Sequence, residues 1–254
     1  MKFLLLGDVV GQDAVAYVTK NLRKQKLTHG IDFTVINGEN AARYNGIDAS
    51  SAEALLDAGA DVITTGNHVY RIQAFEEYLD ASPLVIRPAN YPDACAGKGY
   101  TIIDCGFKRI LVINAVGVIN TDTANSPFDT VDAILKKESG NYDISILDFH
   151  AETTSEKAAM ARYFDGRIDI VVGTHTHVQT NDARILPNGT GFITDLGMCG
   201  PVNSILGIES EIIINRLRRH ASKRFEYAGG EIEARGAIFT YENGKITDAQ
   251  AIKF

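Results

Sequence analysis

The sequence has few cysteines, no apolar run that could cross a membrane and no excess of basic residues. Cys95, Cys105 and Cys199 are odd in number and lack a C-x-x-C spacing, so the sequence predicts neither a disulfide framework nor a zinc finger. No apolar run approaches the roughly 20 residues that span a bilayer. The apolar stretch 3–6 is also too short for the core of a signal peptide, so we expect a cytoplasmic protein without a membrane partner.

The charge balance also restricts the class of partner. Among 254 residues, 25 Lys and Arg stand against 32 Asp and Glu, which gives a formal net charge of −7. Stable binding along a nucleic-acid backbone needs a basic face, so it is not expected here. A small phosphate substrate held by a metal ion remains compatible with this charge.

Short apolar runs alternate with segments of helical periodicity, which is typical of an α/β protein. The five runs are 2–6, 33–36, 61–64, 143–147 and 169–172. Hairpins are expected within 99–116 and within 225–254, where Gly229-Gly230 and Asn243-Gly244 provide turns. We expect one domain over 1–254, in which the Pro-rich stretch 83–92 could open a small inserted cap within about 83–125.

Polar side chains follow each of the five runs. The endings are Gly7-Asp8, then 37–40 (NGEN), 65–68 (TGNH), 148–150 (DFH) and 173–177 (GTHTH). Ligands of open α/β sheets bind outside the carboxyl ends of the strands, so these endings should converge on one edge. Four of the six histidines (His68, His150, His175 and His177) fall there. Their Asp, Glu, Asn and His side chains suit hard or borderline metal ions.

Each motif alone has a plainer explanation. Asp8 could cap a helix, and Asn40 could be only a turn residue. His175 and His177 are two residues apart, so both would face one side of an extended strand. Asp148 and Glu152 are interpreted as supporting or capping groups. The joint occurrence of the motifs predicts a metal site.

Six segments together resemble one protein family. They are 5–11 (LLGDVVG), 35–42 (VINGENAA), 65–69 (TGNHV), 148–157 (DFHAETTSEK), 173–179 (GTHTHVQ) and 194–201 (TDLGMCGP). They resemble the calcineurin-like metallophosphoesterases, and in particular the bacterial YmdB-type 2′,3′-cyclic-nucleotide 2′-phosphodiesterases. The resemblance implies a layered α/β sandwich with a dimetal site at the carboxyl ends of the strands.

Two positions depart from the general superfamily. Val10 stands where its first motif carries a histidine, and Glu39 stands where its second motif carries an aspartate. The branch that this sequence resembles shares both departures. One metal should therefore have fewer protein ligands than is usual in the superfamily.

The resemblance also implies a role for each site residue. Asp8, Glu39 and His177 would hold one divalent ion. A second ion would be held by Asn67, His150, His175 and Glu39, with Glu39 bridging the two. Iron or manganese is the preferred metal, with zinc or magnesium as alternatives.

The implied reaction opens a small-molecule 2′,3′-cyclic nucleotide to a nucleoside 3′-phosphate. The two ions would activate the attacking water. His68 would act as the general acid, and Asn40 would contact the phosphate or the nucleophile.

Other functions stay open at this point. The same ligands fit a broader phosphomonoesterase or phosphodiesterase acting on nucleotides, RNA ends or phosphoproteins. They also fit a metal-loaded regulatory protein with weak catalysis. Arg43 and Tyr44 could contact a phosphate or a base, or form a solvated loop. Pairing of the C-terminal hairpins between subunits would give a homo-oligomer.

Overall fold

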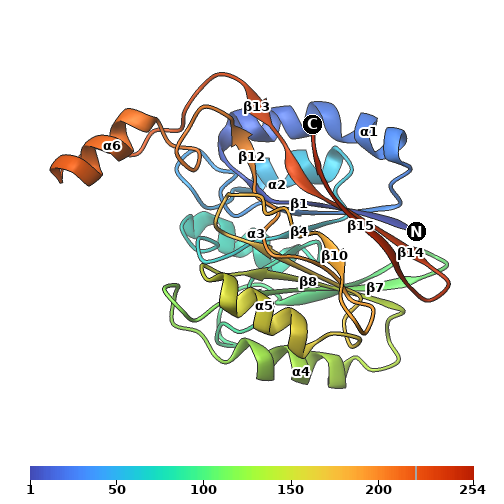
Figure 1. Ribbon diagram of the computed structural model, residues 1–254. Coiled ribbons are helices and arrows are strands. Elements are labelled where there is room, and N and C mark those ends of the chain that lie inside the picture. The colour runs from blue at the N-terminus through green and yellow to red at the C-terminus, as the bar shows by residue number, and fades with distance from the viewer. Residues whose placement is uncertain (221) are drawn as a thin grey trace.

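Two six-stranded sheets pack face to face in the computed structural model, which describes residues 1–220 and 222–254 (Figure 1). In order, the first sheet contains β15 (Lys245–Lys253), β14 (Arg235–Glu242), β1 (Lys2–Leu6), β3 (Phe33–Asn37), β4 (Val62–Thr64) and β5 (Val85–Ile86). The second contains β10 (Arg184–Ile185), β11 (Gly191–Ile193), β9 (Ile170–Thr174), β8 (Ile144–His150), β7 (Arg109–Val116) and β6 (Tyr100–Asp104). A small third sheet pairs β13 (Ile232–Glu233), β12 (Met198–Pro201) and β2 (Asp8–Val9).

Helices cover the outer faces of both sheets. Their bounds are α1 (Gly11–His29), α2 (Ala49–Asp57), the short 3-10 helix η1 (Gln73–Phe75), α3 (Glu76–Ala81), α4 (Pro127–Lys137), α5 (Thr154–Tyr163) and α6 (Ser210–Arg219). Figure 1 shows α1 and α2 above the sheets, α4 and α5 below them, and α6 extending away from the body. None of the helices in the described residues combines the length and the apolar character needed to cross a bilayer.

The alternation of side chains along the strands divides the core into layers. Phe3 and Leu5 of β1 lie in the cluster between the two sheets, whereas Leu4 and Leu6 face the helices on the outside. Strands buried on both faces are expected to be continuous apolar runs, as these are. The predicted layered α/β sandwich is therefore confirmed, and its order is helix, sheet, sheet, helix.

The strand ends converge on one edge, as the sequence predicted, but the strands belong to two sheets rather than one. β1, β3 and β4 belong to the first sheet, and β8 and β9 to the second. Within each sheet these strands are parallel, so their carboxyl ends meet at one edge. The site is thus built where the edges of two stacked sheets meet.

The middle and C-terminal segments are also built into this frame. Residues 83–125, where the sequence allowed an inserted cap, supply β5 to the first sheet and β6 and β7 to the second. The organisation as one domain stays a prediction. In the C-terminal region β14 and β15 form the hairpin expected at Asn243-Gly244. The prediction of a hairpin at Gly229-Gly230 is wrong, because β13, which follows these glycines, pairs with β12 instead.

Candidate active site

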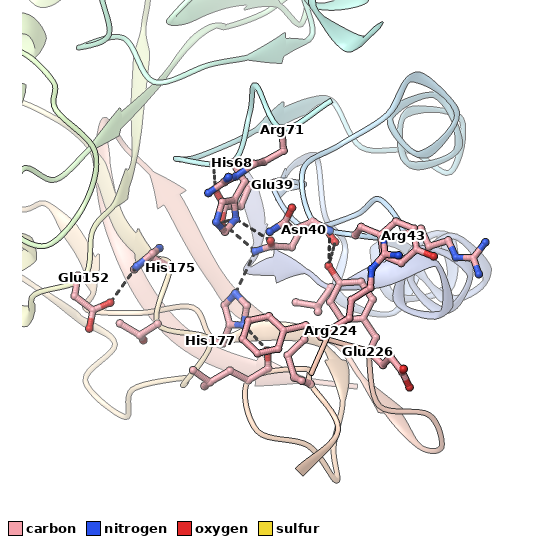
Figure 2. A pocket seen from close by; sticks show the side chains of 18 residues that line it. Glu39, Asn40, Arg43, His68, Arg71, Glu152, His175, His177, Arg224 and Glu226 are labelled. Carbon is pink, nitrogen blue, oxygen red and sulfur yellow. Dashed lines mark hydrogen bonds and ion pairs between the residues drawn. The ribbon is translucent and has the colours of Figure 1, made fainter. Parts of the chain in front are cut away.

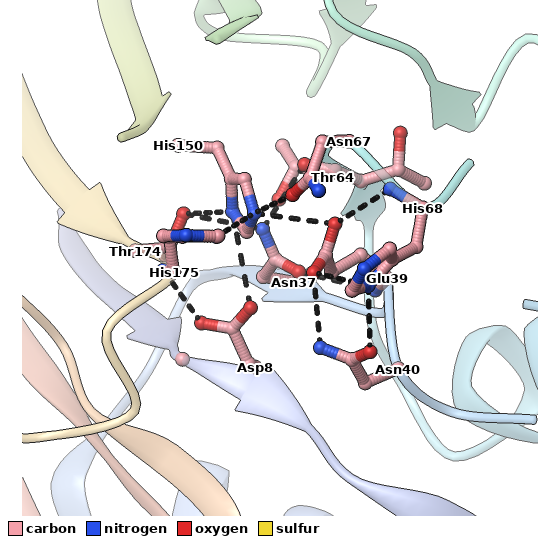
Figure 3. Close-up of polar contacts among 12 residues, drawn as sticks. Asp8, Asn37, Glu39, Asn40, Thr64, Asn67, His68, His150, Thr174 and His175 are labelled. Atoms are coloured by element: carbon pink, nitrogen blue, oxygen red, sulfur yellow. Dashed lines mark hydrogen bonds and ion pairs between the residues drawn. The ribbon is translucent and has the colours of Figure 1, made fainter. Parts of the chain in front are cut away.

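All eight side chains that the sequence assigned to the site lie together (Figures 2 and 3). Asp8 follows β1, Glu39 and Asn40 follow β3, and Asn67 and His68 follow β4. From the second sheet, His150 ends β8, and His175 and His177 follow β9. Gly66 allows this close approach, because a Cβ there would lie 2.2 Å from Oε2 of Glu39 and 2.4 Å from Nε2 of His150.

Three potential metal donors surround Nε2 of His150, which is a fourth. Oε2 of Glu39 and Oδ1 of Asn67 each lie 3.2 Å from it, and Nδ1 of His175 lies 3.0 Å from it. His150 and Glu39 are almost completely buried. Donor atoms of Glu39, His150 and His175 all lie within 4.8 Å of one another, so these three residues form a candidate metal-binding group. Nitrogen and oxygen donors without thiolate suit a divalent ion of borderline character.

A second group of donors surrounds Asp8. Its Oδ2 accepts a hydrogen bond from the backbone N–H of His175 at 3.0 Å. Its Oδ1 is buried and has no hydrogen-bond partner among the residues that the structure describes, and it lies 3.8 Å from Nε2 of His177. A buried carboxylate oxygen without a donor is costly unless a cation satisfies it. The residues present therefore fit a metal ion here too.

Hydrogen bonds orient His150 toward the donor cluster. Its Nδ1 lies 2.9 Å from Oγ1 of Thr174, and the Thr174 hydroxyl donates to Asp148 at 2.7 Å. Thr174 can then accept from the imidazole, which places the proton on Nδ1 and leaves the Nε2 lone pair for a metal. Asp148 also accepts hydrogen bonds from Thr64 and Asn37, so it is a supporting group, as interpreted from the sequence.

His175 and His177 reach the site from strained backbone rather than from an extended strand. β9 ends at Thr174, and the φ angles of His175 and His177 are 100° and 64°. The prediction that His175 and His177 lie on an extended strand is therefore wrong, although both rings do reach the site. Positive φ is unfavourable for residues other than glycine and persists only where the surroundings enforce it.

A buried ion pair enforces this loop geometry. Nζ of Lys157 lies 2.6 Å from Oδ2 of Asp195, and both side chains are about 1% exposed. The same carboxylate oxygen accepts from the hydroxyl and the backbone N–H of Thr176, between the two histidines. Glu152 adds an exposed contact of 3.0 Å to Nε2 of His175. The sequence identified neither Lys157 nor Asp195, although both lie in segments that carry the family resemblance.

His68 and Asn40 form a separate pair beside the donors. Nδ1 of His68 lies 3.0 Å from Oδ1 of Asn40 and 3.1 Å from Oε1 of Glu39. Asn40 in turn donates to Oε1 of Glu39 at 3.0 Å. Because Nδ1 is occupied by these oxygens, the ring can offer its Nε2 to a ligand in the adjoining cavity, which His68 lines.

The charges of the site oppose one another strongly. Burial alone would lower the pKa of His150, but Glu39 and Asp8 outweigh it and raise that pKa to about 9. Burial lowers the pKa of His175 to about 3, with His150 adding to the effect. Burial raises the pKa of Asp8 to about 6, against the opposing effect of His150 and His177. Such shifts are typical of functional sites.

A cavity of about 1200 Å³ opens beside the donors. Glu39, His68, His175 and His177 line it at one side. Figure 2 shows Arg43 and Arg224 across the cavity from His175, with Arg71 next to His68. Cys199, in contrast, is completely buried in the core behind the site, as expected for a small apolar side chain.

Proteins of known sequence and structure resemble this chain along its whole length. A 2′,3′-cyclic-nucleotide 2′-phosphodiesterase of Bacillus subtilis is 40% identical over 243 residues, which cover 96% of this chain and 92% of that protein. The crystal structure of a hypothetical protein from Thermus thermophilus has a TM-score of 0.94 and 35% identity, covering 100% of this chain and 99% of that chain. The crystal structure of a phosphatase from Mycoplasma pneumoniae has a TM-score of 0.93 and 31% identity, covering 100% and 93%.

The family resemblance is confirmed by these relatives and by a direct match. The YmdB-like protein family matches residues 4–252, which include every side chain of the site. The chain belongs to the YmdB-like protein family.

Proposed function

We propose that this chain is a metal-dependent phosphodiesterase that hydrolyses nucleoside 2′,3′-cyclic phosphates to nucleoside 3′-phosphates. The observation that carries the proposal is the convergence of three donor side chains on Nε2 of His150, itself a fourth donor, directly beside His68 and an open cavity. The name of the B. subtilis relative, 40% identical to this chain, supports the choice of substrate.

Two ions would be divided among the donors. Asp8, Glu39 and His177 would hold one, and Asn67, His150, His175 and Glu39 would hold the other. Glu39 is suited to bridging because its two oxygens lie in different surroundings, with Oε2 near His150 and Oε1 near His68. When bound, the ions would lower the pKa of a water and offset negative charge on the phosphate. Manganese or iron is preferred, with zinc or magnesium as alternatives.

The chain's own residues would move the protons and orient the phosphate. A new bond forms between a water oxygen and phosphorus while the bond from phosphorus to O2′ breaks. The departing ribose oxygen needs a proton, and His68 is placed at the cavity to donate it. Asn40 holds Nδ1 of His68 and could donate its own amide to a phosphate oxygen.

A phosphomonoesterase is the second candidate, since a solved relative is named a phosphatase. The deciding experiment incubates Mn²⁺-loaded and chelator-treated protein with 2′,3′-cyclic AMP and, separately, with adenosine 3′-phosphate. We expect metal-dependent formation of adenosine 3′-phosphate, identified by chromatography against the 2′ isomer. Formation of the 2′ isomer would contradict the proposed bond cleavage. Turnover of adenosine 3′-phosphate alone would favour the monoesterase.

A further inference from the structure

The cavity continues well beyond the metal donors. One wall is formed by Arg43 and Tyr44, which follow β3, and by Arg224 and Phe225, which lie between α6 and β13. We call these four residues the distal wall. Figure 2 shows its two arginines on the side of the cavity away from His175 and Glu152.

Two guanidinium groups of the distal wall lie against one aromatic ring, that of Tyr44. The guanidinium carbon of Arg224 lies 4.0 Å from the centroid of the Tyr44 ring, and that of Arg43 lies 5.2 Å from it. Neither guanidinium group forms an ion pair with any carboxylate in residues 1–220 and 222–254. Glu226 lines the same cavity, but no described carboxylate lies within ion-pair distance of either guanidinium group, so a bound anion would offset these two positive charges. Arginine is also well suited to phosphate because its planar group can donate two parallel hydrogen bonds.

The wall also offers aromatic rings that are partly covered by guanidinium groups. The residues Tyr44 and Phe225 are 53% and 43% exposed, and the guanidinium carbon of Arg216 lies 4.8 Å from the centroid of the Phe225 ring. Exposed aromatic rings beside arginines are the means by which proteins bind the splayed bases of single-stranded nucleic acid. Bases also stack on the planes of arginine guanidinium groups, so the wall combines phosphate-binding groups with a stacking surface made of rings and guanidinium groups.

A single cyclic nucleotide does not account for this wall. Its one phosphate is the group that is hydrolysed, and it must lie at the metal donors. Pockets that enclose drug-sized ligands measure roughly 300–1000 Å³. The present cavity is about 1200 Å³ and so leaves room for more than one nucleotide.

The covalent connectivity of RNA places a second phosphate on the side of the ribose that points away from the metal donors. The 2′ and 3′ oxygens lie on one side of the ribose, and the 5′ oxygen lies on the other. With the cyclic phosphate at the donors, a phosphate on the 5′ oxygen points away from them. We propose that the distal wall binds the phosphodiester and base that precede the terminal nucleotide. The preferred substrate would then be a short RNA that ends in a 2′,3′-cyclic phosphate, which deepens and rests on the function proposed above.

The negative net charge is compatible with such a substrate. The distal wall supplies two cations for one phosphate, whereas a protein that follows a nucleic-acid backbone needs an extended basic face. The wall would thus bind the end of an RNA strand rather than contact the strand along its length.

The first test compares kcat/KM for two substrates of the Mn²⁺-loaded enzyme. One is 2′,3′-cyclic AMP, and the other is the dinucleotide ApA with a 2′,3′-cyclic phosphate at its end. We expect the dinucleotide to be favoured by at least about tenfold, because one stacked base and one phosphate contact add binding energy. In the double variant R43A/R224A that ratio should fall close to one. The double variant K24A/R162A, which removes two exposed cations from α1 and α5, serves as the charge-matched control and should keep the ratio.

A third substrate separates two sources of the second phosphate. Adenosine 2′,3′-cyclic phosphate that also carries a 5′-phosphate has a phosphate at the same position but no preceding nucleoside, and its phosphomonoester carries a charge of about −2 instead of −1. A gain as large as that of the dinucleotide would assign the wall to 5′-phosphorylated mononucleotides and overturn the RNA assignment. A clearly larger gain for the dinucleotide supports it.

Equilibrium binding tests the wall without any turnover. Calorimetry would compare the products ApAp and adenosine 3′-phosphate with wild-type protein and with R43A/R224A. We expect ApAp to bind at least about tenfold more tightly, and the double variant to lose that advantage. Equal affinity of the wild type for both products would overturn the inference even if 2′,3′-cyclic AMP is hydrolysed. Conversely, failure to hydrolyse either substrate would contradict the proposed function, and these affinities would still decide whether the wall binds the second phosphate.

Discussion

His68 differs from the other histidines of the site in its partners. Its Nδ1 contacts oxygens of Asn40 and Glu39, whereas the rings of His150 and His175 contact each other. His68→Ala should therefore lower kcat by roughly 10²–10⁴-fold, the usual contribution of a general acid, while two metals per chain remain. Steady-state kinetics and elemental analysis of the same sample would check this. His29→Ala near the end of α1 is the control, and a large loss of metal from His68→Ala would contradict its assigned role.

Glu39 is the residue on which both proposed ions depend. Its carboxylate is about 1% exposed, with one oxygen near His150 and the other near His68. Glu39→Gln keeps the size of the side chain but removes its charge, so we expect both ions to bind at least about tenfold more weakly. Metal content after dialysis would measure this, with Glu77→Gln on the exposed surface of α3 as the control. A variant that retains two ions would rule out the bridge.

The residues that carry the chemistry could be predicted, but the residues that hold them could not. Asp8, Glu39, Asn67 and the histidines follow apolar runs, and the topology of parallel strands then brings them together. Lys157 and Asp195 are 38 residues apart, and their pairing depends on how α5 and the loop after β11 pack. No local pattern marks a lysine as buried.

At the scale of elements, the loop after β9 depends on the pair formed by Lys157 and Asp195. Lys157→Met leaves a buried carboxylate without its partner, so the free energy of unfolding should fall by about 3–5 kcal/mol. Metal affinity should fall as well, because Asp195, which accepts from Thr176 between the two histidines, loses the lysine that holds it in place. Urea unfolding and metal titration would measure both effects.

The matched control for this change is Lys108→Met. Lys108 pairs with Asp143 at 3.3 Å, but both side chains are more than a third exposed. An exposed pair of this kind contributes at most about 1 kcal/mol. Equal destabilisation by the two lysine variants would show that the buried pair has no special role in the loop.

Strands with an apolar pattern of their own could be predicted from the sequence. Strands that exist only through pairing with a distant neighbour could not. The runs at 2–6 and 33–36 became β1 and β3. β2, β5 and β13 have two residues each, so they exist only through pairing with neighbours distant in sequence. Gly229-Gly230 has the composition of a hairpin turn, but the residues before it line the cavity instead of forming a strand.

The molecule as a whole should couple metal binding to pH. Glu39 and Asp8 raise the pKa of His150 to about 9 in the metal-free protein, against the opposing effect of burial. An incoming ion must therefore displace a proton at neutral pH, so Mn²⁺ affinity should rise by up to about tenfold per pH unit between about pH 6.5 and 8.5.

The stability of the metal-free protein should change in the opposite direction. The raised pKa of His150 stabilises the fold fully below its ordinary value of 6.5, and that contribution is lost as the pH rises to about 9. The stabilisation gained on adding Mn²⁺ should thus grow with pH, which calorimetry at several pH values would measure. His150→Gln should weaken the pH dependence. A wild-type affinity that is constant with pH would contradict the displaced proton.

At this largest scale the predicted fold class, family and phosphoesterase class are confirmed. The stacking of two sheets was available only through the family resemblance, because apolar runs do not reveal which strands share a sheet. The single domain, the homo-oligomer and the individual ligand roles stay predictions.

The position of β1 has a consequence for the order of folding. β1 lies inside the first sheet between β3 and β14, and Lys2 is paired with Thr240 near the other end of the sequence. Contacts of such high sequence separation form slowly, because a long loop must close before they are gained. On a ribosome β1 can pair with β14 only after the long segment between them has been synthesised. A metal ion taken up between Asp8 and His177 would then mark a chain that has finished folding, and its uptake could time that event in a refolding experiment.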